Sequence, residues 1–450
     1  MFLPAADPLS EPAGKYREFE VSGCYNPSTD FCIILPLDGS HMKRAIPRPV
    51  KILSIIFLVL LATCLGGYFA INIRPSLGAE GANALRSVFG AEAVARLEDA
   101  VFQVQDAVRQ WEYRLGVKPA VPWSSSAEKI PSPSLVPVTP TATSGIPSTT
   151  PDIAATTPTV EPSPTLTATP VRWPPVAIPA IGKLPGEGQW APYFTDSQGH
   201  MVAYRTFVQP DPGRPYTIAA IAAVDLVQTR LHYMLGFAEP KSDVVKNRTG
   251  TIPEEDRKPG ILLAAFNGGF LTVHGQYGVM VNGKTLTPMR EGFGTLAIFQ
   301  DGRVQIGVWG TDLTSYDGIT VLRQNGPMII EDGKINPQTG NDTPEYWGYT
   351  VHGEVATWRS AVGLSADGKT LYYAVGASMT ISSLAQALKA AGMDAAIQLD
   401  INYYWVLFCT IRFDKNTPTA LPLLAEMKDG RDRYLHKSER DYFYLTTAAG

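Results

Sequence analysis

The stretch Thr380-Ile-Ser-Ser-Leu-Ala-Gln-Ala-Leu-Lys-Ala-Ala-Gly392, followed by Met393 and then Asp394-Ala-Ala-Ile-Gln-Leu-Asp400, indicates the fold class of the C-terminal half. Thr380 can cap a helix and Gly392 can end it. The apolar face of that helix recurs at helical spacing, at Ile381, Leu384, Leu388 and Ala391. The apolar run Ala395–Leu399 then predicts a buried strand that ends in the carboxylate of Asp400.

The surrounding residues 186–450 predict a domain dominated by sheet. Short apolar runs alternate with turns at Asn282-Gly283, Asp301-Gly302, Asp332-Gly333 and Asp367-Gly368. Glycine accepts the positive φ that tight hairpins need. The segment has 265 residues, enough for one large core. We therefore expect an α+β fold, a β-rich mixed-sheet domain with few helices.

Residues 51–74 predict a transmembrane helix. The 22 uncharged residues between Lys51 and Arg74 span roughly 33 Å as a helix, enough for a bilayer core. A buried helix would rarely be apolar all round for this length. A cleaved signal peptide fits less well, because 50 residues precede the run. Positive charges crowd its N-terminal side at Lys43, Arg44, Arg48 and Lys51. Residues 1–50 are thus predicted to be a poorly ordered cytoplasmic tail, and the C-terminal domain to be extracytoplasmic.

Two segments join the anchor to the domain. Residues 80–116 predict an amphipathic helix whose stripe has coiled-coil steps of three and four, at Val94, Leu97, Val101, Val104, Val108, Trp111 and Leu115. Self-association through 94–115 and packing on the membrane surface or the C-terminal domain are equally compatible with this stripe. Residues 117–185 are rich in Pro, Thr and Ser, which is typical of a disordered stalk.

Composition and motifs exclude several functions. The net charge of −4 offers no basic field for nucleic acid. The chain has four cysteines, Cys24, Cys32, Cys64 and Cys409, whose spacing does not indicate a disulfide framework. No Walker A loop, HExxH or GxSxG occurs. No spacing demands a metal and the cofactor stays unknown, although an oxygen-ligand calcium site would leave only a weak signature.

Polar groups follow several predicted strands. The segment Ala264-Ala265-Phe266-Asn267-Gly268-Gly269-Phe270 runs from an apolar strand into an amide and two glycines, Arg359 opens a hairpin, and Asp400 ends a strand. Each has an ordinary explanation as a turn, a surface cation or a strand cap. Together, an amide loop, an arginine and a carboxylate at strand ends can converge on a pocket.

The ordered set resembles the phosphodiester glycosidase family, whose members include bacterial exopolysaccharide-associated proteins. The resemblance covers roughly residues 215–445. It is carried by Asn267–Phe270, Val279–Gly283, Gly326–Ile329 with Asp332-Gly333, Arg359–Gly363, and the helix and strand of 380–400. The family cleaves the bond between a sugar anomeric carbon and a phosphodiester oxygen through a transition state with oxocarbenium character. Together with the predicted membrane anchor, the resemblance implies a membrane-anchored hydrolase acting on a glycan or exopolysaccharide phosphodiester.

The same resemblance assigns candidate roles. Asp400 would activate water or stabilise the sugar cation, Arg359 would grip phosphate, and Glu354 would transfer a proton. Substrate-binding candidates are Asn267, Gly268, Gly269, His274, Asn402 and Tyr404. Members of the family usually follow the last aspartate with Gly-Gly-Gly-Ser, whereas here Ile401–Trp405 follow. Bulky residues keep backbone N–H groups from a phosphate, so either Arg359 holds it or the domain binds a sugar without that phosphate.

Two other functions fit the residues. A non-catalytic carbohydrate-binding domain could stack sugars on Tyr346, Trp347, Tyr403, Tyr404 and Trp405. A purely structural tether would make any pocket accidental.

Overall fold

The computed structural model describes residues 81, 84–86, 88–123, 173–340, 347, 356–428 and 430–448. All described residues belong to one compact unit, Gly66–Gly450. The predicted tail 1–50 and span 51–74 lie outside them. Among the residues that are described, no helix is both long and apolar enough to cross a membrane.

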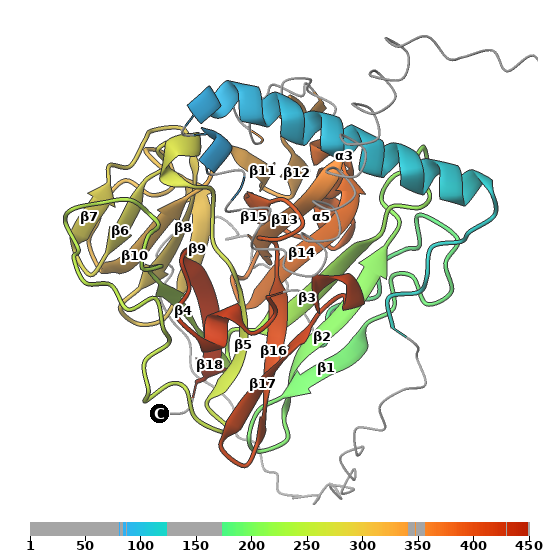
Figure 1. The fold of residues 1–450 in the computed structure, drawn as a ribbon. Coiled ribbons are helices and arrows are strands. Elements are labelled where there is room, and N and C mark those ends of the chain that lie inside the picture. Colours follow the sequence, from blue (N-terminus) through green and yellow to red (C-terminus); the bar gives the residue numbers. More distant parts are fainter. Residues whose placement is uncertain are drawn as a thin grey trace, which may run out of the picture. The chain divides into compact units, whose positions relative to one another are not determined.

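The largest sheet has eight strands (Figure 1). In spatial order they are β1 (Ala191–Thr195), β2 (Met201–Val208), β3 (Ala219–Asp225), β14 (Thr370–Met379), β13 (Thr357–Leu364), β15 (Ala395–Ile401), β11 (Met328–Glu331) and β12 (Lys334–Ile335). The strands β3, β13 and β14 are buried along their whole length, as expected for a central sheet covered on both faces.

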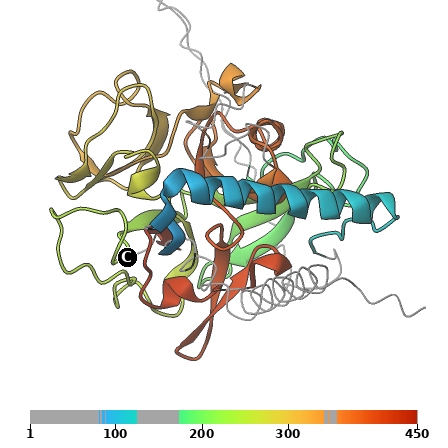
Figure 2. The same cartoon turned by 45° about the horizontal axis from the view of Figure 1, so that its top comes forward.

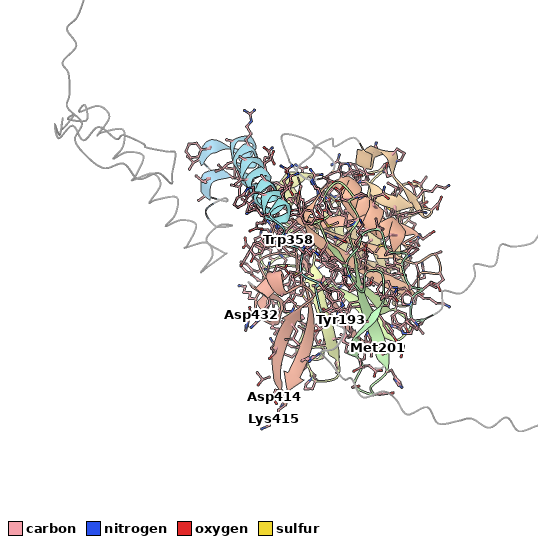
Figure 3. The ribbon with its side chains drawn as sticks, turned by 90° about the vertical axis from the view of Figure 1, so that its right-hand side faces the viewer. Tyr193, Met201, Trp358, Asp414, Lys415 and Asp432 are labelled. Carbon is pink, nitrogen blue, oxygen red and sulfur yellow. The ribbon has the colours of Figure 1, made fainter. Side chains whose placement is uncertain are left out.

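Two five-stranded sheets complete the fold. One runs β7 (Lys284–Thr287), β6 (Val279–Val281), β10 (Ile319–Gln324), β8 (Gly294–Phe299) and β9 (Val304–Val308), drawn in yellow and light orange in Figure 2. The other runs β17 (Thr417–Pro422), β16 (Phe408–Asp414), β5 (Leu262–Asn267), β18 (Tyr442–Thr447) and β4 (Thr229–Met234). The β16–β17 hairpin ends at Asp414 and Lys415, which project away from the sheet (Figure 3).

The α+β class is confirmed, but the expectation of mixed sheets is wrong for the described strands, whose ladders are all antiparallel. Short hairpin loops connect many of these strands, and tight hairpins can join only antiparallel neighbours. Asn282-Gly283 and Asp332-Gly333 both have positive φ at both residues, the geometry predicted for such turns.

The predicted helix and strand form as expected. Helix α5 (Ile381–Ala390) is capped by Thr380, whose Oγ1 accepts a hydrogen bond from the Ser383 N–H at 3.0 Å. The structure also describes helix α3 (Ala91–Arg114) and the 3₁₀ turns η1 (Thr272–His274), η2 (Pro337–Gly340), η3 (Ala425–Lys428) and η4 (Arg433–Leu435). Leu384 and Leu388 of α5 are fully buried in a cluster with Ala361 and Ala374 of the large sheet.

The opposite face of the large sheet packs against the sheet that contains β5. Tyr373 of β14 meets Phe266 and Phe408, with ring centroids 5.3 and 5.2 Å apart. Phe266 also stacks on Phe443 of β18 at 5.2 Å. Aromatic contacts of this kind bury large apolar areas. They bring the ends of β5 and β18 close to the end of β15.

Both described ends of the predicted stalk contact the same strand. Trp123 packs edge-on against Phe207 of β2 with ring centroids 5.6 Å apart. Trp173 packs against Tyr204 of β2 at 5.3 Å, and its indole N–H donates to the Met201 carbonyl. Residues 173–185, which the sequence places in the linker, therefore contact the domain. Residues 124–172 lie outside the described part.

Candidate functional site

Three strand ends meet at the backbone of Gly268. Its N–H donates to the carbonyl of Asp441, and its own carbonyl accepts from the Asp400 N–H, both at 3.1 Å. Asp441 directly precedes β18, whose first residue Tyr442 pairs with Asn267 at the end of β5. The two carboxylate-bearing residues, 41 positions apart in sequence, are thus tied to one glycine.

Only glycine fits at positions 268 and 269. A Cβ on Gly268 would lie 2.7 Å from the Asp441 carbonyl oxygen, and one on Gly269 would lie 2.7 Å from the Arg323 guanidinium carbon. Both separations are shorter than real Cβ contacts, and the first involves backbone that cannot rotate away. Close approach, rather than a special φ, is the reason for the two glycines, since neither has positive φ.

Asn267 positions the loop. Its side-chain N–H groups donate to the Gly268 carbonyl and to Ser360 Oγ, both at 3.0 Å. Its Oδ1 accepts from the Tyr373 hydroxyl at 2.7 Å and from the Leu407 N–H at 3.1 Å. These four bonds use the whole hydrogen-bonding capacity of an amide side chain. Asn267 therefore lines the site while holding strands together, rather than offering a group to a sugar.

A β-bulge directs the Asp400 side chain. Ala361 of β13 pairs with Gln398, whereas Arg359 pairs with Ile401. Moving two residues along β13 therefore corresponds to moving three residues along β15, so β15 contains one extra residue. In an unbroken strand Asp400 would share the face of Gln398, because side chains alternate with a period of two. The extra residue instead turns Asp400 towards the face of Asn267. Bulges often re-aim a side chain in this way beside active sites.

Asp400 is buried and paired with an arginine. It is 6% exposed, its Oδ1 accepts from the Ile401 N–H at 2.8 Å, and its Oδ2 forms an ion pair with Arg440 Nη1. Burial raises the pKa of Asp400 to about 6, although the Arg440 guanidinium and the Ile401 N–H act to lower it. A carboxyl group in this range changes its protonation state near neutral pH, as catalytic carboxyl groups do.

Asp441 is the second carboxylate. Its Oδ2 accepts from Arg323 Nε and from the Tyr233 hydroxyl, each at 2.8 Å. Arg323 is 1% exposed and also donates to the carbonyls of Phe270 and Gln324. A buried ion pair with this many hydrogen bonds fixes the carboxylate in one orientation. Asp441 is therefore rigidly placed beside Asp400.

These groups surround one small cavity. Its walls are formed by Asn267, Gly268, Gly269, Asp400, Trp405, Arg433, Tyr434, Ser438, Arg440 and Asp441. Its volume is about 10 Å³, roughly that needed for a single water molecule. Two carboxylates and two arginines thus converge on one small space.

Both arginines lie on aromatic rings of the loop that follows Asp400. The guanidinium carbon of Arg440 lies 3.7 Å from the ring centroid of Trp405. That of Arg433 lies 4.5 Å from the ring of Tyr404 and 5.6 Å from the ring of Trp405. Cation–π contacts orient each guanidinium without using its N–H donors. Tyr404 and Trp405 therefore support the two guanidinium groups.

The loop that carries the arginines is fastened by backbone hydrogen bonds. The N–H groups of Phe237 and Ala238 donate to the carbonyls of Ser438 and Glu439 at 3.0 and 3.1 Å, and the Ser438 N–H donates to Gly250 at 2.8 Å. The backbone before Arg440 is thereby fixed.

Arg359 does not line this cavity. It is 1% exposed and lies on the other face of β13, where it donates to the carbonyls of Met379 and Trp347 and to Gln398 Oε1. Its neighbour Ser360 faces the site and donates to the Asp400 carbonyl at 2.7 Å. Because side chains alternate along a strand, Arg359 and Ser360 cannot share a face. The predicted phosphate grip by Arg359 is therefore replaced by a structural role.

The other predicted residues have different positions. Asn402 has φ 90° and its Oδ1 accepts from the Tyr404 N–H, so it shapes the turn. Tyr404 supports Arg433, and it is Trp405 that lines the cavity. His274 lies outside the cavity wall, and burial lowers its pKa to about 4, with Arg86 and Arg440 adding to the effect. Glu354 lies outside the described residues.

Sequence reasoning missed Arg433, Arg440 and Asp441. They belong to the polar run Arg431-Asp-Arg-Tyr-Leu-His-Lys-Ser-Glu-Arg-Asp441, which is charged enough to be taken for an exposed loop. The only signal was its position directly before the last apolar strand. Among the described residues, no group of three or more His, Cys, Asp or Glu side chains is placed to hold a metal. Cys409 is buried and free.

Comparison with known proteins gives a family match for part of the chain. The phosphodiester glycosidase family model matches residues 261–400. No curated protein matches the chain.

Among solved structures, the catalytic domain of zebrafish N-acetylglucosamine-1-phosphodiester alpha-N-acetylglucosaminidase, auto-inhibited by its pro-peptide, is 18% identical, with 58% of this chain and 86% of that chain covered and a TM-score of 0.37. A hypothetical protein from Synechocystis is 12% identical over 57% of this chain and 64% of its own, with a TM-score of 0.36. Residues 261–400 thus match the phosphodiester glycosidase family, the family that the order of the sequence motifs indicated.

Proposed function

We propose that this protein hydrolyses a sugar-1-phosphodiester linkage in a glycan or exopolysaccharide. The observation that supports this most strongly is the convergence of Asp400 and Asp441 with Arg433 and Arg440 on one cavity. Carboxylates stabilise the cationic sugar of a glycosidic transition state. Arginines bind phosphate bidentately. A site with both kinds of group matches a substrate in which a sugar carbon is bonded to a phosphodiester oxygen.

In this mechanism Asp400 is the catalytic carboxylate. The bond between the anomeric carbon and the phosphodiester oxygen breaks, and the oxygen keeps the electron pair. Phosphate is a good leaving group, so it needs cationic stabilisation more than a proton. Asp400, ionised, stabilises the sugar cation or takes a proton from the attacking water. The products are a free sugar and a phosphomonoester.

The substrate phosphate takes the place that Asp400 now occupies on Arg440. The cavity is too small for a sugar while Arg440 is paired with Asp400. A substrate phosphate competes for the guanidinium, and rotation of the Arg440 side chain both opens the cavity and frees Asp400. Asp441 remains fixed by its ion pair with Arg323. We propose that Asp441 orients the sugar hydroxyls.

The alternative of a non-catalytic sugar-binding surface is less favoured. Such surfaces use exposed aromatic faces, but the rings of Tyr404 and Trp405 are covered by arginines. Trp347 is 2% exposed and buried in the core. Trp347 therefore has no open face for a sugar, and an arginine competes with a sugar for the rings of Tyr404 and Trp405.

Hydrolysis by the purified full chain in detergent tests the proposal. We expect a panel of sugar-1-phosphodiesters to yield free sugar and phosphomonoester, with a rate that rises with pH around pH 6, because Asp400 must be ionised. The phosphomonoester is detected by its release of inorganic phosphate after phosphatase treatment. Binding of the same compounds without product would support the carbohydrate-binding alternative instead.

We also propose that the enzyme is a single-pass membrane protein with its C-terminal domain extracytoplasmic. This rests on the uncharged run between Lys51 and Arg74 and on the basic residues before it. Protease added to intact cells should remove the domain, whereas an N-terminal tag should survive until lysis. The reverse pattern would overturn the orientation.

A further inference from the structure

Helix α3 is docked on the domain through polar groups. Asp106 Oδ1 accepts from the Tyr216 hydroxyl at 3.1 Å, and Asp106 Oδ2 lies 3.5 Å from Arg214 Nε. Tyr113 also meets Tyr216, with ring centroids 6.1 Å apart. The helix is drawn in blue and cyan in Figures 1 and 2. These contacts turn the Asp106 side of the helix towards the domain.

The apolar stripe of α3 is exposed as a consequence. Its members are 46 to 63% exposed, namely Leu97, Val101, Val104, Val108, Trp111 and Leu115. Val94, which begins the stripe, is the exception at 3% exposed. A helix that packed its stripe on its own domain would bury these side chains. The prediction that the stripe packs on the C-terminal domain is therefore wrong for Leu97 onwards.

Two kinds of partner remain for this exposed stripe, a membrane surface and a second helix. Helices that lie on membranes are rich in Lys and Arg, whereas α3 has five acidic residues (Glu92, Glu98, Asp99, Asp106, Glu112) against three basic ones (Arg96, Arg109, Arg114). That balance opposes an anionic lipid surface. The steps of three and four, held from Val94 to Leu115, are instead the spacing that keeps a narrow seam facing a second helix.

We propose that α3 pairs with α3 of a second copy of this chain as a parallel coiled coil. With Val94, Val101, Val108 and Leu115 at a positions, the g positions are Ala93, Ala100, Ala107 and Arg114, and the e positions are Glu98, Gln105 and Glu112. In a parallel pair each e residue faces a g alanine of the other helix, so no like charges meet.

An antiparallel pair is less favourable. It would bring Glu98 beside Glu112 of the second copy, although Arg86 pairs with Glu98 in its own chain at 2.7 Å. The docked Asp106 face stays on the domain in either arrangement, because it lies on the opposite side of the helix from the seam. The proposal does not depend on the catalytic function.

Cysteine cross-linking of the full chain in detergent tests the seam and its direction. In a background with Cys24, Cys32 and Cys64 replaced by Ser, Leu97→Cys should form a disulfide-linked dimer, because a parallel pair places residue 97 against itself. Gln103→Cys, an exposed control off the seam, should not. Absence of the Leu97→Cys dimer, or equal cross-linking by both variants, overturns the proposal.

Light scattering supplies an independent measurement. The full chain should have the mass of a dimer, and Val101→Glu with Val108→Glu should convert it to a monomer. Both valines are half exposed, so thermal unfolding of the domain should be unchanged. Gln103→Glu adds a charge off the seam and should leave the dimer intact. A strictly monomeric wild type at high concentration, or a dimer that persists in the double variant, contradicts the seam.

Discussion

Replacing Asp400 with Asn is expected to lower the turnover of a sugar-1-phosphodiester by about 10²- to 10⁴-fold, the range for loss of one catalytic acid–base group. Asparagine has nearly the same shape but cannot carry the negative charge that stabilises the sugar cation. It can also no longer pair with Arg440, so substrate phosphate should meet less competition for that guanidinium. We therefore expect kcat to fall while KM stays the same or falls, measured by steady-state phosphomonoester release.

Asp394→Asn is the matched control. Asp394 immediately precedes the same strand at its other end, where its backbone bonds to Leu364 and Gly333. Losing its charge should leave kcat and KM within error of the wild type. If Asp400→Asn retained wild-type turnover with its thermal unfolding unchanged, Asp400 would not be the catalytic carboxylate.

Replacing Arg440 with Gln is expected to have two separable effects. Loss of a charged phosphate contact should raise KM by about ten- to a hundredfold, since hydrogen bonds to charged groups contribute about 1.5–3 kcal/mol. The Arg440 charge lowers the pKa of Asp400 against the effect of burial. Removing it raises that pKa above about 6, so the rise in kcat/KM with pH should move to higher pH.

Arg433→Gln separates the two effects. Arg433 lines the same cavity, but it is not among the groups that shift the pKa of Asp400. Its loss should raise KM and leave the pH midpoint in place. A pH profile that is the same for Arg440→Gln and wild type would show that the ion pair with Asp400 does not control its ionisation.

The sequence predicted those parts of the site whose structure is local. The cap at Thr380, the apolar face of α5 and the apolar run of β15 depend on residues within a few positions of one another. The Asn267-Gly268-Gly269 loop was also recognisable, because close backbone approach admits only glycine. It was correctly placed beside Asp400, since both stand at the ends of buried strands.

The tertiary structure decided that Arg440, rather than Arg359, is the arginine that pairs with Asp400. Alternation along regular strands would give Asp400 the face of Gln398 and Arg359, but one extra residue in β15 reverses it. A bulge has no reliable sequence signature, because it depends on the register between two strands. The same is true of α3, whose stripe was visible in the sequence but whose exposure depends on contacts with Arg214 and Tyr216.

By itself, then, the sequence determined the helix–strand unit, the glycine loop, the terminal carboxylate and the family they indicate. Only the tertiary structure brought Arg440 and Asp441 to them, by pairing β18 with β5 so that Tyr442 lies opposite Asn267. The physical reason is that local propensities and side-chain periodicity act over a few residues. Strand pairing between positions more than 170 residues apart is chosen by the packing of the whole core around Phe266, Tyr373 and Phe443.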